Sequence, residues 1–82
     1  MIQVSIRFYS YFKDLAGCEA TTQTMPDGSS AGDLLEKLGQ RYPRLTALRK
    51  SALLAVGLEY QSRDYRLQPG DEIALFPPVQ GG

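Results

Sequence analysis

Hydrophobic and polar residues alternate strictly at the start of the chain. In the segment 2–8, IQVSIRF, every second residue is apolar. Side chains of a strand point alternately to its two faces, so this period of two predicts a strand with one buried face. A Thr-rich segment, residues 19–25, predicts a second strand that pairs with the first as a hairpin and ends at the turn sequence Pro-Asp-Gly of residues 26–28.

After residue 30 the apolar positions change to helical spacing. Ser30 is followed three positions later by Asp33, an acidic variant of the capping box that begins many helices. Pro43 stops the helix at or just before Tyr42, because the residue before a proline is disfavoured in helical geometry. The sequence therefore predicts one main helix with a single apolar stripe. The stripe consists of Leu34, Leu35, Leu38 and Tyr42.

The second half of the chain predicts further strands. The uninterrupted apolar run Ala52–Val56 favours a strand that is covered on both faces. Residues 60–67 are polar and irregular, and we expect them to hold a short edge strand. A Pro-Gly turn at 69–70 then leads into a last strand, Glu72–Phe76.

The order of these elements predicts the fold class. A hairpin, one crossover helix and a final strand form a mixed sheet with the main helix packed on one face. This is the layout of an α+β protein with a β-grasp (ubiquitin-like) fold. We expect residues 1–76 to form this domain and residues 77–82 to form an extended C-terminal Gly-Gly tail.

Composition narrows the classes of function. The chain has 82 residues, no His, one Cys, and nine basic against nine acidic residues. A single Cys without His excludes an internal disulfide, a four-ligand metal site and every Ser-His or Cys-His catalytic group within this chain. A net charge of zero gives no reason to expect binding to nucleic acid, and no apolar run is long enough to span a membrane. We therefore expect a cytoplasmic protein with no metal site.

The tail is the segment with chemical content. Pro77 and Pro78 end the strand and favour a stiff exit, and six residues can reach about 20 Å. Gly81 and Gly82 lack Cβ atoms, so they can enter a narrow channel and present an unhindered carboxylate. Such a carboxylate can be activated as an acyl-adenylate, and a sulfur donor can then convert it to a thiocarboxylate. That chemistry needs no side chain of this protein, because another protein supplies the acid, base and phosphate sites.

The C-terminal sequence GDEIALFPPVQGG, residues 70–82, resembles the end of the MoaD family, the small subunits of molybdopterin synthase. The start Met-Ile-Gln-Val and the segment KDLAG at 13–17 extend the resemblance over nearly the whole chain. It implies a ubiquitin-like sulfur carrier that donates sulfur without catalytic side chains of its own. The sulfur would complete the dithiolene of the molybdenum cofactor.

The resemblance also implies partners. An E1-like (MoeB-like) adenylyltransferase would activate the chain with ATP as its co-substrate, and a sulfur donor protein would load it. A large subunit (MoaE-like) would then bind the carrier, in a heterotetramer, and no cofactor would stay bound to this chain.

Site residues follow from the matching positions. Gly82 would carry the adenylate and then the thiocarboxylate, and Gly81 would line the tunnel of the large subunit. The other partner-binding positions would be Gln80, Val79, Pro78, Pro77, Phe76, Tyr60 and Tyr9. The sequence departs from the family pattern at Gly57 and Arg66, which bears on local partner contacts.

Other functions stay open at this point. A ThiS-type carrier for thiazole (thiamine) synthesis also ends in Gly-Gly, a ubiquitin-like modifier would form isopeptides with lysines, and a binding module would use the fold as a scaffold.

Several residues also have a purely structural interpretation. Phe8 and Phe12 are expected in the core, and Cys18 is expected to be an incidental, half-buried thiol. Phe76 could be buried within the domain instead of serving an interface. Solvated surface residues are expected at Asp71, Glu72, Arg41, Arg44, Arg49 and Lys50.

Overall fold

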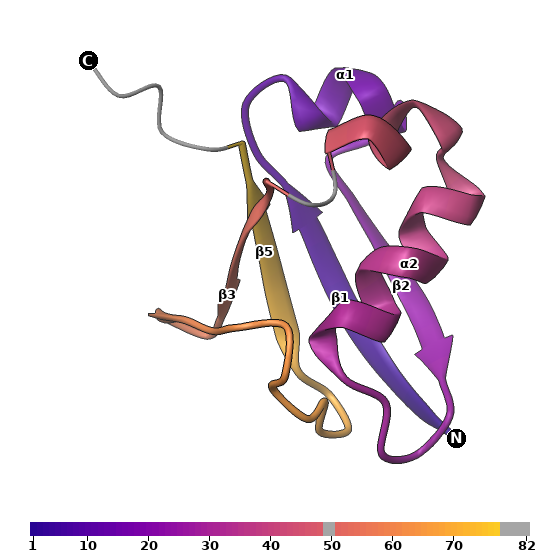
Figure 1. The fold of residues 1–82 in the computed structure, drawn as a ribbon, viewed down its shortest axis with the longest axis vertical. Coiled ribbons are helices and arrows are strands. Elements are labelled where there is room, and N and C mark those ends of the chain that lie inside the picture. Colours follow the sequence, from indigo (N-terminus) through magenta and orange to yellow (C-terminus); the bar gives the residue numbers. More distant parts are fainter. Residues whose placement is uncertain (49–50, 78–82) are drawn as a thin grey trace.

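The structure, a computed structural model, describes residues 1–48 and 51–77, and these form one five-stranded sheet with its helices (Figure 1). The strands are β1 (Ile2–Phe8), β2 (Ala20–Met25), β3 (Leu53–Val56), β4 (Glu59–Tyr60) and β5 (Glu72–Phe76). Their spatial order is β2-β1-β5-β3-β4. The central pair β1 and β5 is parallel, and the other neighbours are antiparallel. This mixed sheet is the β-grasp arrangement that the sequence predicts.

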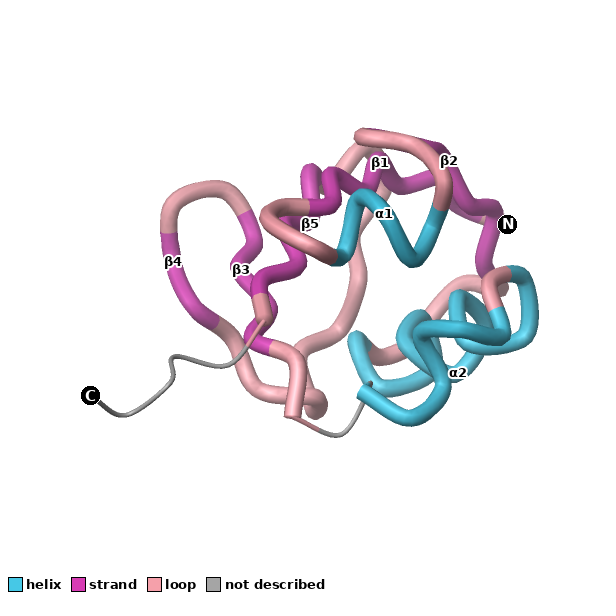
Figure 2. Tube along the Cα trace, turned by 90° about the horizontal axis from the view of Figure 1, so that it is seen from above, coloured by secondary structure: helices cyan, strands magenta, loops and turns pink. Residues whose placement is uncertain are grey.

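The helices are α1 (Phe12–Ala16), α2 (Ala31–Arg41) and a 3-10 helix, η1 (Pro43–Leu48). Figure 2 shows α2 crossing one face of the sheet. Within the described residues the opposite face has no second layer, and we call it the outer face. None of the helices of the described chain is long and apolar enough to cross a membrane.

The alternation along β1 is confirmed residue by residue. Val4, Ile6 and Phe8 are each 1% exposed, and the residues between them are exposed. Their side chains pack with Leu34 and Leu38 of α2, which are also buried. The apolar face of β1 and the apolar stripe of α2, which the two patterns predict, therefore pack together in one core.

The capping box of α2 forms as predicted. The Ser30 Oγ accepts a hydrogen bond from the Asp33 N–H (3.1 Å), and the Asp33 carboxylate accepts one from the Ser30 N–H (3.0 Å). The helix ends at Arg41, with Tyr42 as its C-cap residue. The Tyr42 ring meets the Phe8 ring edge-on at 5.7 Å, so the end of α2 is fixed against β1.

The expected short edge strand is β4, although it covers only Glu59–Tyr60, and the rest of the segment 60–67 is loop apart from one bridge between Ser30 and Arg66. A strand so short has no alternation that a sequence can display. One strand prediction needs correction. The run 52–56 is not covered on both faces: Leu53, which pairs with Phe76 on the outer face, is only half-buried, because a helical layer lies on one side of β3 alone.

The basic cluster is also not simply solvated. Arg41 donates hydrogen bonds to the backbone and side chains of β2, because the last turn of α2 ends beside that strand. Arg44 is exposed as expected, and Arg49 and Lys50 lie outside the described residues.

Candidate functional site

The sequence places the chemistry beyond β5. This strand ends at Phe76, and Pro77 follows it half-buried and outside the ladder, which is the strand end that the two prolines predict. The expected site residues Pro78, Val79, Gln80, Gly81 and Gly82 lie outside the described residues. Their roles, and the division of the chain at residue 76, stay predictions.

Three aromatic residues to which the family resemblance gives a role in partner binding come together on the outer face. The rings of Tyr9 and Phe76 stack at 4.7 Å with an interplanar angle of 13°, and Tyr60 meets Phe76 at 6.2 Å and 63°. We call Tyr9, Tyr60 and Phe76 the aromatic cluster. Tyr9 is 40% exposed and Tyr60 is 68% exposed, so the cluster is accessible to another protein. Phe76 is half-buried, and its ring contacts the rings of both Tyr9 and Tyr60.

The central strands of the sheet hold the cluster beside the exit of the tail. β1 and β5 run parallel with Phe8 opposite Leu75, and the Tyr9 N–H donates to the Leu75 carbonyl at 3.1 Å. Ile73 and Leu75 are buried in the core, so Phe76 points to the outer face because successive strand residues alternate. In Figure 1 the end of β5 lies at the end of the molecule opposite the N-terminus.

The third ring arrives from β4 through strand pairing. Ala55 lies opposite Tyr60 in the β3–β4 ladder and opposite Ala74 in the β3–β5 ladder. Only Ala55 lies between Tyr60 and β5, and because Ala55 and Ala74 are both small, the Tyr60 ring can reach across them to Phe76. This arrangement also explains how Ala55 is 7% exposed on a face without a second layer.

Sequence reasoning missed Leu58. Its side chain is fully exposed at the turn between β3 and β4, two residues before Tyr60. Gly57 precedes it with φ of +64°, a backbone conformation that favours glycine and allows the tight turn. The signal was an apolar residue directly after a turn glycine, where polar residues are usual. Leu58 therefore presents an exposed apolar side chain at the turn that leads into β4.

A hydrogen-bonded turn fixes the start of β5. The Asp71 carboxylate accepts hydrogen bonds from the Tyr65 hydroxyl and the Gln68 N–H, both at 2.8 Å. Asp71 is therefore half-buried and structural, which corrects the prediction of a solvated residue, whereas Glu72 is exposed as predicted. The hydrogen bond to the Asp71 carboxylate, then burial and the negative charge of that carboxylate, raise the pKa of Tyr65 above its usual value of 10.0.

The described residues contain no other arrangement that indicates catalysis. They hold no group of three or more His, Cys, Asp or Glu residues suited to a metal ion. Cys18 is half-buried with its Sγ 3.9 Å from the Tyr42 hydroxyl, as expected of an incidental thiol. Phe8 and Phe12 are in the core as predicted.

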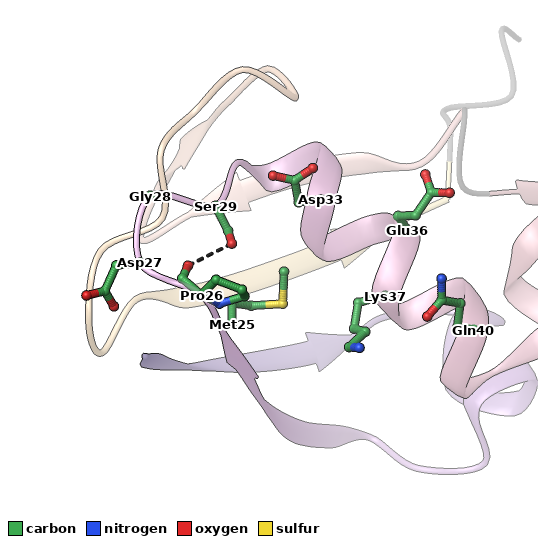
Figure 3. Close-up of a pocket in the computed structure, with 9 residues that line it drawn as sticks. All are labelled: Met25, Pro26, Asp27, Gly28, Ser29, Asp33, Glu36, Lys37 and Gln40. Carbon is green, nitrogen blue, oxygen red and sulfur yellow. Dashed lines mark hydrogen bonds between the residues drawn. The ribbon is translucent and has the colours of Figure 1, made fainter.

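A shallow pocket between the β2–α2 turn and α2 contains several acidic groups (Figure 3). The carboxylates of Asp27, Asp33 and Glu36 point away from one another. Asp33 serves the capping box, and Asp27 pairs with the amino group of Met1 at 3.1 Å. The pocket is therefore a structural feature at the end of the molecule away from the end of β5.

Comparisons of the sequence with known proteins identify relatives of this chain. Residues 6–82 match the model of the ThiS family. The molybdopterin synthase sulfur carrier subunit of Dictyostelium discoideum is 36% identical over 83 residues, which cover 98% of this chain and 96% of that protein.

Solved structures match the fold. A Pyrococcus furiosus protein described as a candidate molybdopterin converting factor, subunit 1, has a TM-score of 0.88 at 26% identity, covering 96% of this chain and 100% of that one. The small archaeal modifier protein 1 of H. volcanii has a TM-score of 0.87 at 22% identity, again over 96% and 100% of the two chains. The second likeness is one of fold alone.

Proposed function

The chain belongs to the ThiS family, and we propose that it is the sulfur carrier subunit of a molybdopterin synthase, carrying sulfur as a thiocarboxylate on Gly82. One observation supports this proposal most strongly: the strand that leads to the Gly-Gly terminus ends within an accessible cluster of three aromatic rings. A carrier needs a docking surface beside its reactive end, and the aromatic cluster supplies one.

The proposed loading has two steps. The Gly82 carboxylate attacks the α-phosphate of ATP in the active site of an E1-like adenylyltransferase, which releases pyrophosphate and forms an acyl-adenylate. A sulfur nucleophile at the oxidation level of sulfide, supplied by a donor protein, then attacks the carbonyl carbon and displaces AMP. The product is a thiocarboxylate, whose sulfur is a better nucleophile than the oxygen that it replaces.

In the delivery step the carrier binds the large subunit through the aromatic cluster. Exposed aromatic residues near the centre of an interface provide much of the binding energy of protein complexes. The tail then places the thiocarboxylate in the active site of the large subunit, where its sulfur bonds to a pyranopterin precursor and water then cleaves the carbon–sulfur bond to Gly82, restoring the carboxylate of the carrier. Each carrier delivers one sulfur, and a dithiolene contains two, so two loaded carriers are needed for each product. A heterotetramer with two carriers satisfies that requirement.

Variants of the terminus test this proposal. Deletion of Gly82, or addition of one alanine after it, should abolish sulfur transfer in a reconstituted synthase, because the reactive carbon is lost or misplaced. Both variants should keep the thermal stability of the parent chain, since Leu75 is the last core residue of the described part of the chain. Extension of the N-terminus by one alanine is the matched control and should keep transfer. Transfer by the variant without Gly82 would contradict the proposal.

The same assay separates the alternative carriers. A ThiS-type carrier would deliver its sulfur to a thiazole synthase and not to a molybdopterin synthase large subunit. A modifier would appear as an isopeptide adduct on lysine residues of other proteins.

A further inference from the structure

The outer edge of β2 lacks the usual protection of an edge strand. β2 is an end strand of the sheet, and its sequence, ATTQTM, contains no charged residue, proline or glycine. Edge strands with such sequences are templates for pairing with another chain, and natural proteins normally block them with charges, prolines or bulges. Protection of this edge must therefore come from another part of the molecule.

The hydrogen-bond pattern of the β1–β2 pair shows which backbone groups of β2 point to its free edge. The Phe8 N–H donates to the Glu19 carbonyl across the β1–β2 pair at 2.8 Å. In an antiparallel ladder, residues of one strand turn their backbone groups alternately to its two sides. Counting on from Glu19, the carbonyl and N–H groups of Ala20, Thr22 and Thr24 are directed to the free edge.

Arg41 covers two of these three carbonyls. Its Nη1 donates to the Thr22 carbonyl at 2.8 Å and to the Gln23 Oε1 at 2.9 Å. The Gln23 Nε2 in turn donates to the Thr24 carbonyl at 2.9 Å, so Arg41 holds the amide that covers this second carbonyl. The Nη2 of Arg41 also donates to the Thr21 Oγ1 at 3.0 Å. The guanidinium group of Arg41, at the end of α2, thus holds together the hydrogen bonds that block the Thr22 and Thr24 carbonyls. We call this arrangement the Arg41 clamp.

We propose that the outer edge of β2 is a strand-addition surface for a second copy of this chain, and that the Arg41 clamp keeps it closed. A second copy of the chain is the partner that fits this edge, because β2 is complementary to itself. An antiparallel pair of β2 strands about a two-fold axis near Thr22 joins identical donors and acceptors. Within β2 it opposes no like charges, because the strand has no charged residue, and it places Thr22 opposite its copy, a favourable cross-strand pair.

This edge lies on the side of the sheet away from β4, so dimerisation through it leaves Tyr60 accessible. The inference is therefore independent of the sulfur-carrier proposal.

Substitution of Arg41 tests the clamp. Arg41→Met keeps much of the side-chain length but removes every donor, and Arg44→Met removes an exposed positive charge a few residues later as the matched control. Sedimentation velocity of the full chain over a wide concentration range should show a monomer for the wild type and for Arg44→Met. Arg41→Met should show a concentration-dependent dimer, with an association constant raised about tenfold or more, because each carbonyl set free can accept an intermolecular hydrogen bond.

A cross-link locates the contact. In a Cys18→Ser, Thr22→Cys background, oxidised glutathione should produce a disulfide-linked dimer when Arg41 is replaced by Met and much less when Arg41 is present. Hydrogen exchange at the Thr22 and Thr24 amides should slow in the dimer.

Three results would overturn the inference: a folded Arg41→Met chain that stays monomeric, a dimer without the cross-link, or a wild type that already pairs through β2. If Arg41→Met does not fold, Gln23→Ala removes only the cover of the Thr24 carbonyl. A folded Gln23→Ala chain with wild-type association would then be equally decisive.

Discussion

Phe76 has two separable roles in this account, and its truncation to alanine tests both. In the free chain the ring is half-buried, stacked on Tyr9 at 4.7 Å and in contact with Tyr60. An aromatic pair contributes about 0.5–1.5 kcal/mol beyond its buried area. Partial loss of apolar burial adds a similar amount, so Phe76→Ala should lower the free energy of unfolding by about 1–3 kcal/mol. A fully buried Phe would cost about 3–5 kcal/mol.

The second role concerns the large subunit. If the aromatic cluster is the docking surface, Phe76 lies at its centre, because both other rings contact it. The same truncation should then weaken binding to the large subunit by more than about 1 kcal/mol, that is, raise Kd by a factor of at least about five. Urea denaturation of the free chain measures the first quantity, and titration calorimetry with the large subunit measures the second.

Two controls separate stability from binding. Leu75→Ala removes a buried neighbour that faces the core, so it should lower stability by about 2–5 kcal/mol while the folded fraction binds with nearly unchanged affinity. Thr24→Ala changes an exposed residue of β2, at the edge of the sheet away from Tyr60, and should leave binding unchanged. Unchanged affinity of Phe76→Ala, together with the expected stability loss, would refute its assignment to the interface.

Three further changes have defined outcomes. Ser30→Ala removes the side-chain half of the capping box and should lower the free energy of unfolding by about 1 kcal/mol in urea titrations, whereas the exposed Thr24→Ala should not. Because the pKa of Tyr65 is raised on folding, its hydrogen bond to Asp71 contributes fully below pH about 10 and is lost as the pH rises through the folded-state pKa. The stability difference between wild type and Tyr65→Phe should therefore be constant below that pH and shrink above it; a constant difference throughout would contradict the assignment. Leu58→Ser should weaken large-subunit binding without lowering stability, since its side chain has no folded contacts to lose; unchanged affinity would exclude it from the docking surface.

Local signals predicted most of the fold. The alternation in β1 and the Ser30–Asp33 pair are patterns that a few neighbouring residues determine, and both have the expected structure. A short edge strand was expected within residues 60–67, but the bounds of β4 could not be predicted, because two residues display no period and their place depends on pairing with β3. Asp71 was assigned to solvent, since the sequence does not show that the Tyr65 hydroxyl returns to it across the turn.

The candidate site was predicted in part for the same reason. Phe76 follows from alternation in β5, but its stacking on Tyr9 depends on the parallel pairing of two strands from opposite ends of the chain. The role of Arg41 was missed entirely, because its partners in β2 lie 18 to 20 positions away in sequence. Such contacts follow from how the elements pack and have no local pattern.

The mass of the C-terminal peptide after loading tests the central claim most directly. The chain is incubated with its adenylyltransferase, ATP and a sulfur donor, and the C-terminal peptide is then analysed by mass spectrometry. Exchange of one carboxylate oxygen for sulfur should add about 16 Da, localised to Gly82 by fragmentation and absent when ATP is omitted. An unchanged mass with an adenylyltransferase that is active on this chain, or an added sulfur that maps to Cys18, would contradict the account.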